Sequence, residues 1–211
     1  MKIILIRQAE PDMKWEKSYN AEDFARVYEA ARNQSTSAVS ARRSDAAAYR
    51  VYTGTSRAAA ETAELLFELA EPPVKTPLLD DVQLRPFRDT DKKSPLWQWR
   101  TIGCIQWAFG SERQAESGKK TLERLRSFVD RLEAEDQDCI VICGSLILAV
   151  LKTILRFRGY CLEGGELIPK PLDRIRATKQ SLHCGGCHHN CLLSAPKCQI
   201  GQNKARNGAN R

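Results

Sequence analysis

The chain has 211 residues, a formal net charge of +7, 42% hydrophobic residues and 28% charged residues. This length supports one good-sized core and a small appendage, and the composition is typical of a soluble globular protein. The charge suits an anionic ligand or weak attraction to nucleic acid, but decides neither. The apolar runs are too short or too interrupted for a secretion signal or a membrane span, so we expect a cytoplasmic protein that does not enter membranes.

The first half of the chain alternates short β-branched runs with helical patterns. Strands are predicted at Lys2–Arg7 and Arg50–Thr53. Apolar residues at helical spacing predict a helix over 21–32. Ser56 is a suitable N-cap for a second helix, predicted over 57–69. Three prolines then bracket an extended segment that ends near residue 79.

The second half continues the alternation after a polar, irregular stretch at 80–93. Helices are predicted over the tryptophan-rich segment 96–109, over the amphipathic segment 117–135 and over the apolar segment 146–157. A buried strand is predicted at Cys139–Cys143. The segment 166–179 is expected to supply one or two edge strands, because prolines interrupt it.

Strands that alternate with helices predict an α/β fold with a mostly parallel sheet covered on both faces. We expect this α/β domain to span residues 1–180. The composition changes near residue 181, so a short cysteine-rich segment is predicted at 181–198. Residues 199–211 are rich in Gly, Asn, Lys and Arg and are expected to form a mobile basic tail.

Arg7 ends the first predicted strand and is succeeded by a short polar loop. In α/β proteins, ligands bind just beyond the carboxyl ends of the strands. The planar and permanently charged guanidinium of Arg7 suits a phosphate group. An arginine that closes a strand can equally form a structural ion pair, so the position alone does not establish a site.

Five stretches of the chain, in order, resemble motifs of the histidine phosphatase superfamily, the phosphoglycerate-mutase-like proteins. These stretches are Arg7-Gln8-Ala9-Glu10, residues 52–63, Leu84-Arg85, Glu116-Ser117 and residues 139–151. The resemblance implies a three-layer α/β/α fold over residues 1–180 with a phosphate pocket at the strand ends. The expected phosphate-binding residues are Arg7, Gln8, Arg57, Arg85 and Ser145.

The resemblance also places unsuitable residues at the catalytic positions. Gln8 stands at the nucleophilic histidine, Ala58 at a second phosphate-binding arginine, Pro86 at the acidic residue and Cys143 at the second histidine. An amide nitrogen is not a usable nucleophile, and proline cannot exchange a proton. No histidine precedes His183. These losses predict a catalytically inactive or very weak pseudophosphatase that retains an anion pocket.

Two alternatives stay open. The chain can be an active phosphohydrolase with a substitute nucleophile, or with water activated by a carboxylate such as Glu10, while Asp89 or Asp91 replaces the missing acid. A cysteine phosphatase loop at Cys143 is disfavoured, because the residue six positions later is Ala149 and not arginine. The second alternative is a metal or redox sensor, or an interaction protein, for which the α/β body is a scaffold.

A second motif lies near the end of the chain, with the spacing C-x2-C-x3-C-x6-C. Two thiolates two residues apart on a glycine turn can bind one metal ion. We expect zinc or a [4Fe–4S] cluster, with disulfides or free thiols as the alternatives. The candidate ligands are Cys184, Cys187, Cys191 and Cys198, with His183, His188 or His189 as possible substitutes.

The expected partners follow from these two motifs. A phosphate or a phosphorylated small molecule suits the pocket, and a protein partner suits the tail. The basic tail contains no aromatic residue on which a base can stack, which argues against a nucleic-acid partner.

Overall fold

The computed structural model describes residues 1–36, 43–165 and 169–179. These residues belong to one compact unit, Met1–Gln180. The other unit, Ser181–Arg211, lies outside the described residues. The predicted segments 181–198 and 199–211 therefore stay predictions.

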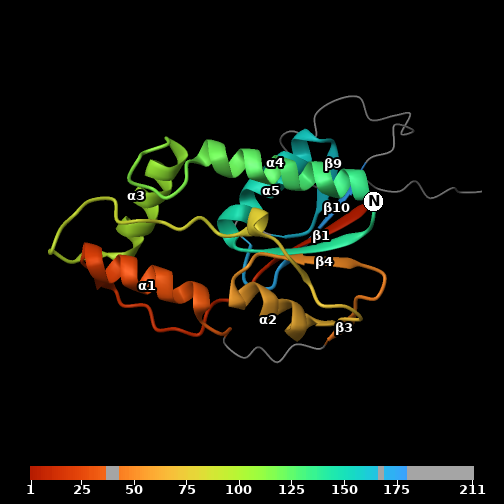
Figure 1. Cartoon of the computed structure of the whole chain (residues 1–211), viewed down its shortest axis with the longest axis horizontal. Coiled ribbons are helices and arrows are strands. Elements are labelled where there is room, and N and C mark those ends of the chain that lie inside the picture. The colour runs from red at the N-terminus through yellow and green to blue at the C-terminus, as the bar shows by residue number, and fades with distance from the viewer. Residues whose placement is uncertain (37–42, 166–168, 180–211) are drawn as a thin grey trace, which may run out of the picture. The chain divides into compact units, whose positions relative to one another are not determined.

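A six-stranded sheet with the strand order β6-β4-β8-β1-β10-β9 forms the centre of the compact unit (Figure 1). Its strands are β1 (Lys2–Arg7), β4 (Arg50–Thr53), β6 (Val74–Lys75), β8 (Cys139–Cys143), β9 (Tyr160–Glu163) and β10 (Arg174–Lys179). The strands β6, β4, β8 and β1 are parallel, and β10 runs antiparallel to both of its neighbours. The predicted mostly parallel sheet is confirmed.

Two short strand pairs lie outside this sheet. The pairs are β2 (Ser18–Tyr19) with β7 (Ser94–Pro95), and β3 (Ser44–Asp45) with β5 (Phe67–Glu68).

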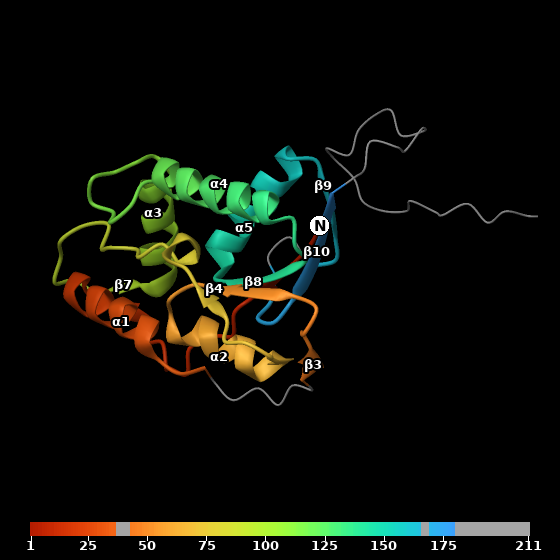
Figure 2. The same cartoon turned by 45° about the vertical axis from the view of Figure 1, so that its right-hand side comes forward.

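The helices complete the layers. They are α1 (Ala21–Asn33), α2 (Arg57–Leu66), α3 (Leu96–Ala108), α4 (Gly118–Glu135) and α5 (Ser145–Phe157), with a short 3₁₀ turn η1 (Pro77–Leu79). Helices α4 and α5 cover one face of the sheet and α2 covers the other (Figure 2). Helices α1 and α3 lie beyond the carboxyl ends of the parallel strands (Figure 1). The three-layer α/β/α arrangement matches the prediction.

Local chemistry explains where these elements begin. Asn20, Ser56 and Ser117 are the N-caps of α1, α2 and α4, and each side chain accepts a hydrogen bond from a backbone N–H three residues later. All five residues of β8 are buried, because helices cover both faces of this central strand. The sheet therefore holds the carboxyl ends of β1, β4 and β8 in fixed register.

The structure corrects three details of the predicted elements. Helix α2 ends at Leu66, and the next two residues form β5. Strand β10 is not an edge strand, since it pairs with β1 and with β9. The prolines that suggested an edge, Pro169 and Pro171, precede β10 and do not interrupt it. The edge strand on this side of the sheet is β9, which the sequence pattern did not indicate.

Candidate functional site

A cavity of about 350 Å³ opens at the carboxyl ends of β1 and β8. Its walls also come from α1, α3, the N-terminus of α5 and the loop that follows η1. We call this cavity the carboxyl-end pocket. The charged and polar residues that line it include Arg7, Gln8, Arg32, Asp81, Arg100 and Ser145.

Arg7 is the last residue of β1, and both terminal nitrogens of its guanidinium have partners. Nη1 donates to the carbonyl of Pro169 at 2.7 Å, and Nη2 donates to Oε1 of Glu10 at 3.1 Å. The charge of Arg7 is therefore balanced by a carboxylate in the free protein. An anionic ligand competes with Glu10 for this arginine.

Gln8 is fixed by both ends of its side-chain amide. Nε2 donates to Oδ2 of Asp81 at 3.2 Å, and Oε1 accepts from the hydroxyl of Ser56 at 3.4 Å. Its backbone N–H donates to the carbonyl of Cys143 at 2.9 Å, which ties the end of β1 to the end of β8. Gln8 therefore lies between the N-cap of α2 and the loop after η1, at the floor of the pocket.

Asp81 is a pocket residue that the sequence analysis did not identify. Its carboxylate lies directly over Gly144, since a Cβ placed on Gly144 would lie 1.9 Å from both carboxylate oxygens. Burial against surrounding groups raises the pKa of Asp81 from 3.8 to about 6, while the guanidinium of Arg124 acts in the opposite direction. The side chain is enclosed by protein groups yet remains open to solvent through the pocket. Asp81 thus exchanges a proton near neutral pH.

The loop that carries Asp81 is held by an arginine on α4. Arg124 donates to the carbonyls of Leu78 and Asp80, and its Nε donates to Oε1 of Glu116 at 2.8 Å. The side chain of Asp80 also lies at the pocket, but it accepts from the backbone N–H of Thr55 at 2.6 Å and from the guanidinium of Arg32. Of two adjacent aspartates, one therefore fixes the loop and pairs with an arginine, and the other has no ion pair among the described residues.

The outer wall of the pocket is aromatic. The guanidinium carbon of Arg100 lies 4.5 Å from the ring centroid of Trp15, and the rings of Trp15 and Tyr28 lie 6.1 Å apart. Burial raises the pKa of Tyr28 to about 12, so its hydroxyl stays protonated. Within residues 1–36, 43–165 and 169–179, Arg100 forms no ion pair. It is thus a pocket guanidinium that an anionic group can approach.

The structure brings some of the predicted phosphate-binding residues together and leaves others apart. Arg7, Gln8 and Ser145 line the pocket. Arg57 is not among the lining residues, since its side chain is 61% exposed and donates from Nε to Glu61 at 2.6 Å. Arg85 is exposed and also lies outside the lining set.

Of the other positions at which the resemblance places an unsuitable residue, some line the pocket and others do not. Ala58 lines the pocket, whereas Pro86 does not. Cys143 ends β8 and is 1% exposed, and burial raises the pKa of its thiol well above the usual value. A protonated, buried thiol is a poor nucleophile. Asp89, expected as a possible substitute acid, is exposed and pairs with Arg113 at 2.8 Å, which lowers its pKa.

The predicted metal ligands lie outside the described residues. These are Cys184, Cys187, Cys191 and Cys198, with His183, His188 and His189. Among the residues that the structure describes, no group of three or more His, Cys, Asp or Glu side chains is arranged to hold a metal ion. In the same part of the chain, none of the helices is both long and apolar enough to cross a membrane.

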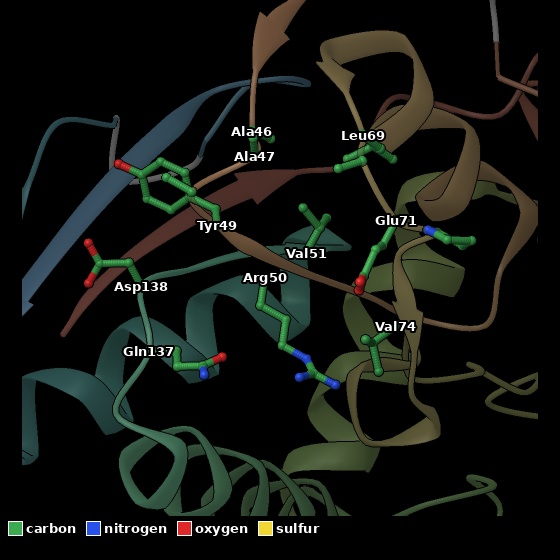
Figure 3. Close-up of a pocket in the computed structure, with 13 residues that line it drawn as sticks. Ala46, Ala47, Tyr49, Arg50, Val51, Leu69, Glu71, Val74, Gln137 and Asp138 are labelled. Carbon is green, nitrogen blue, oxygen red and sulfur yellow. The ribbon is translucent and has the colours of Figure 1, made fainter.

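A second cavity, of about 420 Å³, lies at the opposite end of the sheet (Figure 3). We call it the amino-end pocket. Two of its polar residues contact Lys2: Asp138 accepts from the backbone N–H of Lys2 at 2.7 Å, and the hydroxyl of Tyr49 accepts from Lys2 Nζ at 3.1 Å. The guanidinium of Arg50 lies 6.0 Å from the ring centroid of Tyr52. Alanine and proline supply much of the remaining lining.

The chain is similar to solved structures of phosphatases. A proposed alpha-ribazole-5'-P phosphatase from Escherichia coli matches with a TM-score of 0.46 and 19% identity, over 74% of this chain and 79% of that chain. The alpha-ribazole phosphatase from Shigella flexneri matches with a TM-score of 0.46 and 13% identity, over 82% and 96%. A mycobacterial glucosyl-3-phosphoglycerate phosphatase matches with a TM-score of 0.41 and 13% identity, over 73% and 78%.

The TM-scores of these three structures are below 0.5, so the likeness assigns no family to this chain. No protein-family model matches the chain, and no curated protein does. Identities of 13 to 19% concern the fold and assign no activity to this chain.

Proposed function

We propose that this chain is a histidine-phosphatase-like protein that binds a small phosphorylated molecule in the carboxyl-end pocket without carrying the phosphoryl group on a side chain. The observation that supports this proposal most directly is the position of Gln8. Its amide nitrogen lies at the end of β1 and is engaged by Asp81 at 3.2 Å. The lone pair of an amide nitrogen is delocalised into its carbonyl, so Gln8 cannot attack phosphorus.

Several pocket groups favour an anion. Arg7 and Arg100 line the cavity, and helix α5 begins beside it at Ser145. The N-cap of α5 is Gly144, which provides no side-chain acceptor for the first backbone N–H groups of the helix. Free N–H groups at a helix N-terminus favour a negative charge, and a guanidinium adds directed hydrogen bonds. This combination supports binding of a phosphate group.

Calorimetric titration with inorganic phosphate and phenyl phosphate tests the proposal. We expect millimolar or tighter binding that falls roughly tenfold in Arg7→Ala, since a charge-assisted hydrogen bond contributes about 1.5–3 kcal/mol. Arg57→Ala is the matched control, because this exposed arginine lies outside the pocket. Absence of binding heat at millimolar ligand, or an equal loss in both variants, contradicts the proposal.

A water-based phosphohydrolase is the second candidate, and the pKa of Asp81 supports it. A carboxyl with a pKa of about 6 can accept a proton from water near neutral pH. Glu10, the carboxylate expected from the sequence for this role, is engaged by Arg7 at 3.1 Å. Turnover of p-nitrophenyl phosphate that is lost in both Arg7→Ala and Asp81→Asn would favour this candidate over simple binding.

The cysteine-rich motif supports a separate proposal, a structural or sensing metal site. Its spacing of four cysteines suits zinc or a [4Fe–4S] cluster. Elemental analysis of protein purified without air or chelator tests it. About one zinc per chain, or about four iron and four sulfide, is expected for a filled site. Protein free of both metals, with four titratable thiols in the motif, contradicts it.

A further inference from the structure

The position of Asp81 bears on which anion the carboxyl-end pocket accepts. Its carboxylate covers Gly144, the N-cap of α5, and accepts from the amide of Gln8 at 3.2 Å. A ligand oxygen that reaches Gln8 and Ser145 therefore arrives beside Asp81. Two negative oxygens in contact repel each other unless a proton lies between them.

The charges around Asp81 do not remove the repulsion between its carboxylate and a ligand oxygen. Among the described residues, Arg7 pairs with Glu10 and Arg32 pairs with Asp80, so two of the nearby guanidiniums already balance carboxylates. Asp81 has no ion pair in this part of the chain. The ionisable groups that face it or line the same pocket are Arg7 and Glu10 after β1, Tyr28 and Arg32 on α1, Asp80 beside it, Arg100 and Cys104 on α3, Arg124 on α4 and Cys143 on β8.

We propose that Asp81 makes the pocket selective for phosphate groups over sulfate groups, by sharing one proton with the bound oxyanion. The inference rests on the proposed phosphate-binding function and names the residue that sets its specificity. A phosphomonoester or inorganic phosphate has an oxygen that still carries, or readily takes, a proton near neutral pH. That oxygen donates to Asp81 when Asp81 is ionised, and accepts from Asp81 when Asp81 is protonated.

Sulfate has the same tetrahedral shape but carries no proton at neutral pH. It can therefore meet Asp81 only when Asp81 supplies the proton. Because burial raises the pKa of Asp81 to about 6, that form becomes scarce as the pH rises above this value. Two groups that share a proton titrate as a pair, so the discrimination is a property of Asp81 and the ligand together.

Calorimetric titration of the full chain with sodium phosphate and sodium sulfate, at matched ionic strength, tests this proposal. At about pH 8 we expect wild-type protein to bind phosphate at least roughly tenfold more tightly than sulfate. At about pH 5 the ratio should fall severalfold, because Asp81 is then protonated before the ligand arrives. In Asp81→Asn, which has no charge to repel sulfate, the ratio at about pH 8 should fall to within about threefold.

Two further variants keep the test decisive. Asp91→Asn removes the same charge from an exposed position of the same loop region and should retain the wild-type ratio. Gly144→Ala places a methyl group where the Asp81 carboxylate lies, so it should displace that carboxylate and lower the ratio even if Asp81→Asn folds poorly.

The outcomes separate the two proposals. If wild-type protein binds phosphate and sulfate equally at about pH 8, the specificity inference alone is overturned. The same holds if Asp81→Asn and Gly144→Ala leave the ratio of the two affinities unchanged. Failure of wild-type protein to bind phosphate at either pH overturns the proposed function together with the inference.

Discussion

The two ends of the central sheet each carry a cavity, but they differ in how their charged groups are used. The two cavities are similar in volume, at about 420 Å³ at the amino end and about 350 Å³ at the carboxyl end. Its acid Asp138 and its Tyr49 hydroxyl both serve to hold Lys2. At the carboxyl end, Asp81 and Arg100 face the cavity without an ion-pair partner among the described residues.

This contrast shows that the volume of a cavity does not identify the site in this molecule. The carboxyl ends of parallel strands and the N-terminus of the following helix meet at one edge, so the topology gathers donors there. At the other edge, Asp138 accepts from the backbone N–H of Lys2 through its side chain and from the backbone N–H of Arg50 through its carbonyl. The carboxyl-end pocket is therefore the better candidate although the two cavities are similar in volume.

The largest effect is expected where α3 anchors the carboxyl end. Trp99 is fully buried, and its indole N–H donates to the carbonyls of Tyr19 and Ser94 at 2.9 and 3.1 Å. Trp99→Ala should lower the free energy of unfolding by about 3–5 kcal/mol and weaken phosphate binding, since α3 carries Arg100. Urea denaturation measures the loss. Trp97→Ala on the same helix is the control, because Trp97 is 64% exposed.

A loss below about 1 kcal/mol in Trp99→Ala would show that α3 is not tied to the core as described. Equal losses in the two tryptophan variants would have the same meaning. Either result would weaken the distinction between the two ends of the sheet.

The next effect concerns the loop that positions Asp81. Arg124 is 17% exposed and joins Leu78 and Asp80 to Glu116. Arg124→Met keeps the apolar stem but removes these donors, so we expect a loss of about 2 kcal/mol of stability and a further loss of phosphate affinity. Thermal unfolding and calorimetry measure the two quantities. Arg126→Met, at an exposed position of the same helix, should change neither.

If Arg124→Met loses stability but keeps full phosphate affinity, the loop does not need this arginine to present Asp81. The carboxyl-end pocket would then be shaped by the sheet and helices alone.

Much of this framework could be predicted from residue patterns. Strands β1, β4 and β8 have the predicted bounds, because each contains a short run of buried apolar residues in a covered sheet. Helix α4 follows its apolar period and its Ser117 cap. Arg7 and Gln8 were expected at the pocket because they lie at the end of a strand and in a motif that resembles a family's phosphate site, and both signals are local in the sequence.

The remaining site residues depend on contacts between distant segments. Asp81 lies over Gly144 and on a loop that Arg124 holds, and both residues are far from it in the sequence. Arg57 shows the opposite error: its neighbours Ser56 and Ala58 line the pocket, but each residue of a helix is turned by about 100° from the last, so the arginine points to solvent. The residue pattern within one segment does not predict which side chains of a distant segment it will contact.

A smaller effect is expected from the pH dependence of stability. The pKa of Asp81 in the folded chain, about 6, is above its ordinary value of 3.8. The folded state therefore holds this proton more tightly, so the contribution of Asp81 to stability is most favourable below about pH 4 and is lost as the pH rises through about 6. Asp81→Asn should remove this loss and raise the Tm at about pH 8, with no gain at about pH 4.

Solvent reaches Asp81 through the pocket, so the expected gain is modest, about 1 kcal/mol or 2–4 °C. Scanning calorimetry of wild type, Asp81→Asn and the exposed control Asp91→Asn across this pH range measures it. A gain of equal size at both pH values, or the same gain in the control, would show that Asp81 is not the titrating group.

The smallest effect is expected at the amino-end pocket. Arg50 is exposed and lies 6.0 Å from the ring centroid of Tyr52, a contact that contributes about 0.5 kcal/mol. Arg50→Gln should change the free energy of unfolding by no more than about 0.5 kcal/mol and leave phosphate affinity unchanged. Calorimetric titration with phosphate compares this variant with Arg100→Gln, which should lose phosphate affinity severalfold. If Arg50→Gln weakens phosphate binding as much as Arg100→Gln does, the carboxyl-end pocket is not the only anion site, because Arg50 lines the amino-end pocket and Arg100 lines the carboxyl-end pocket.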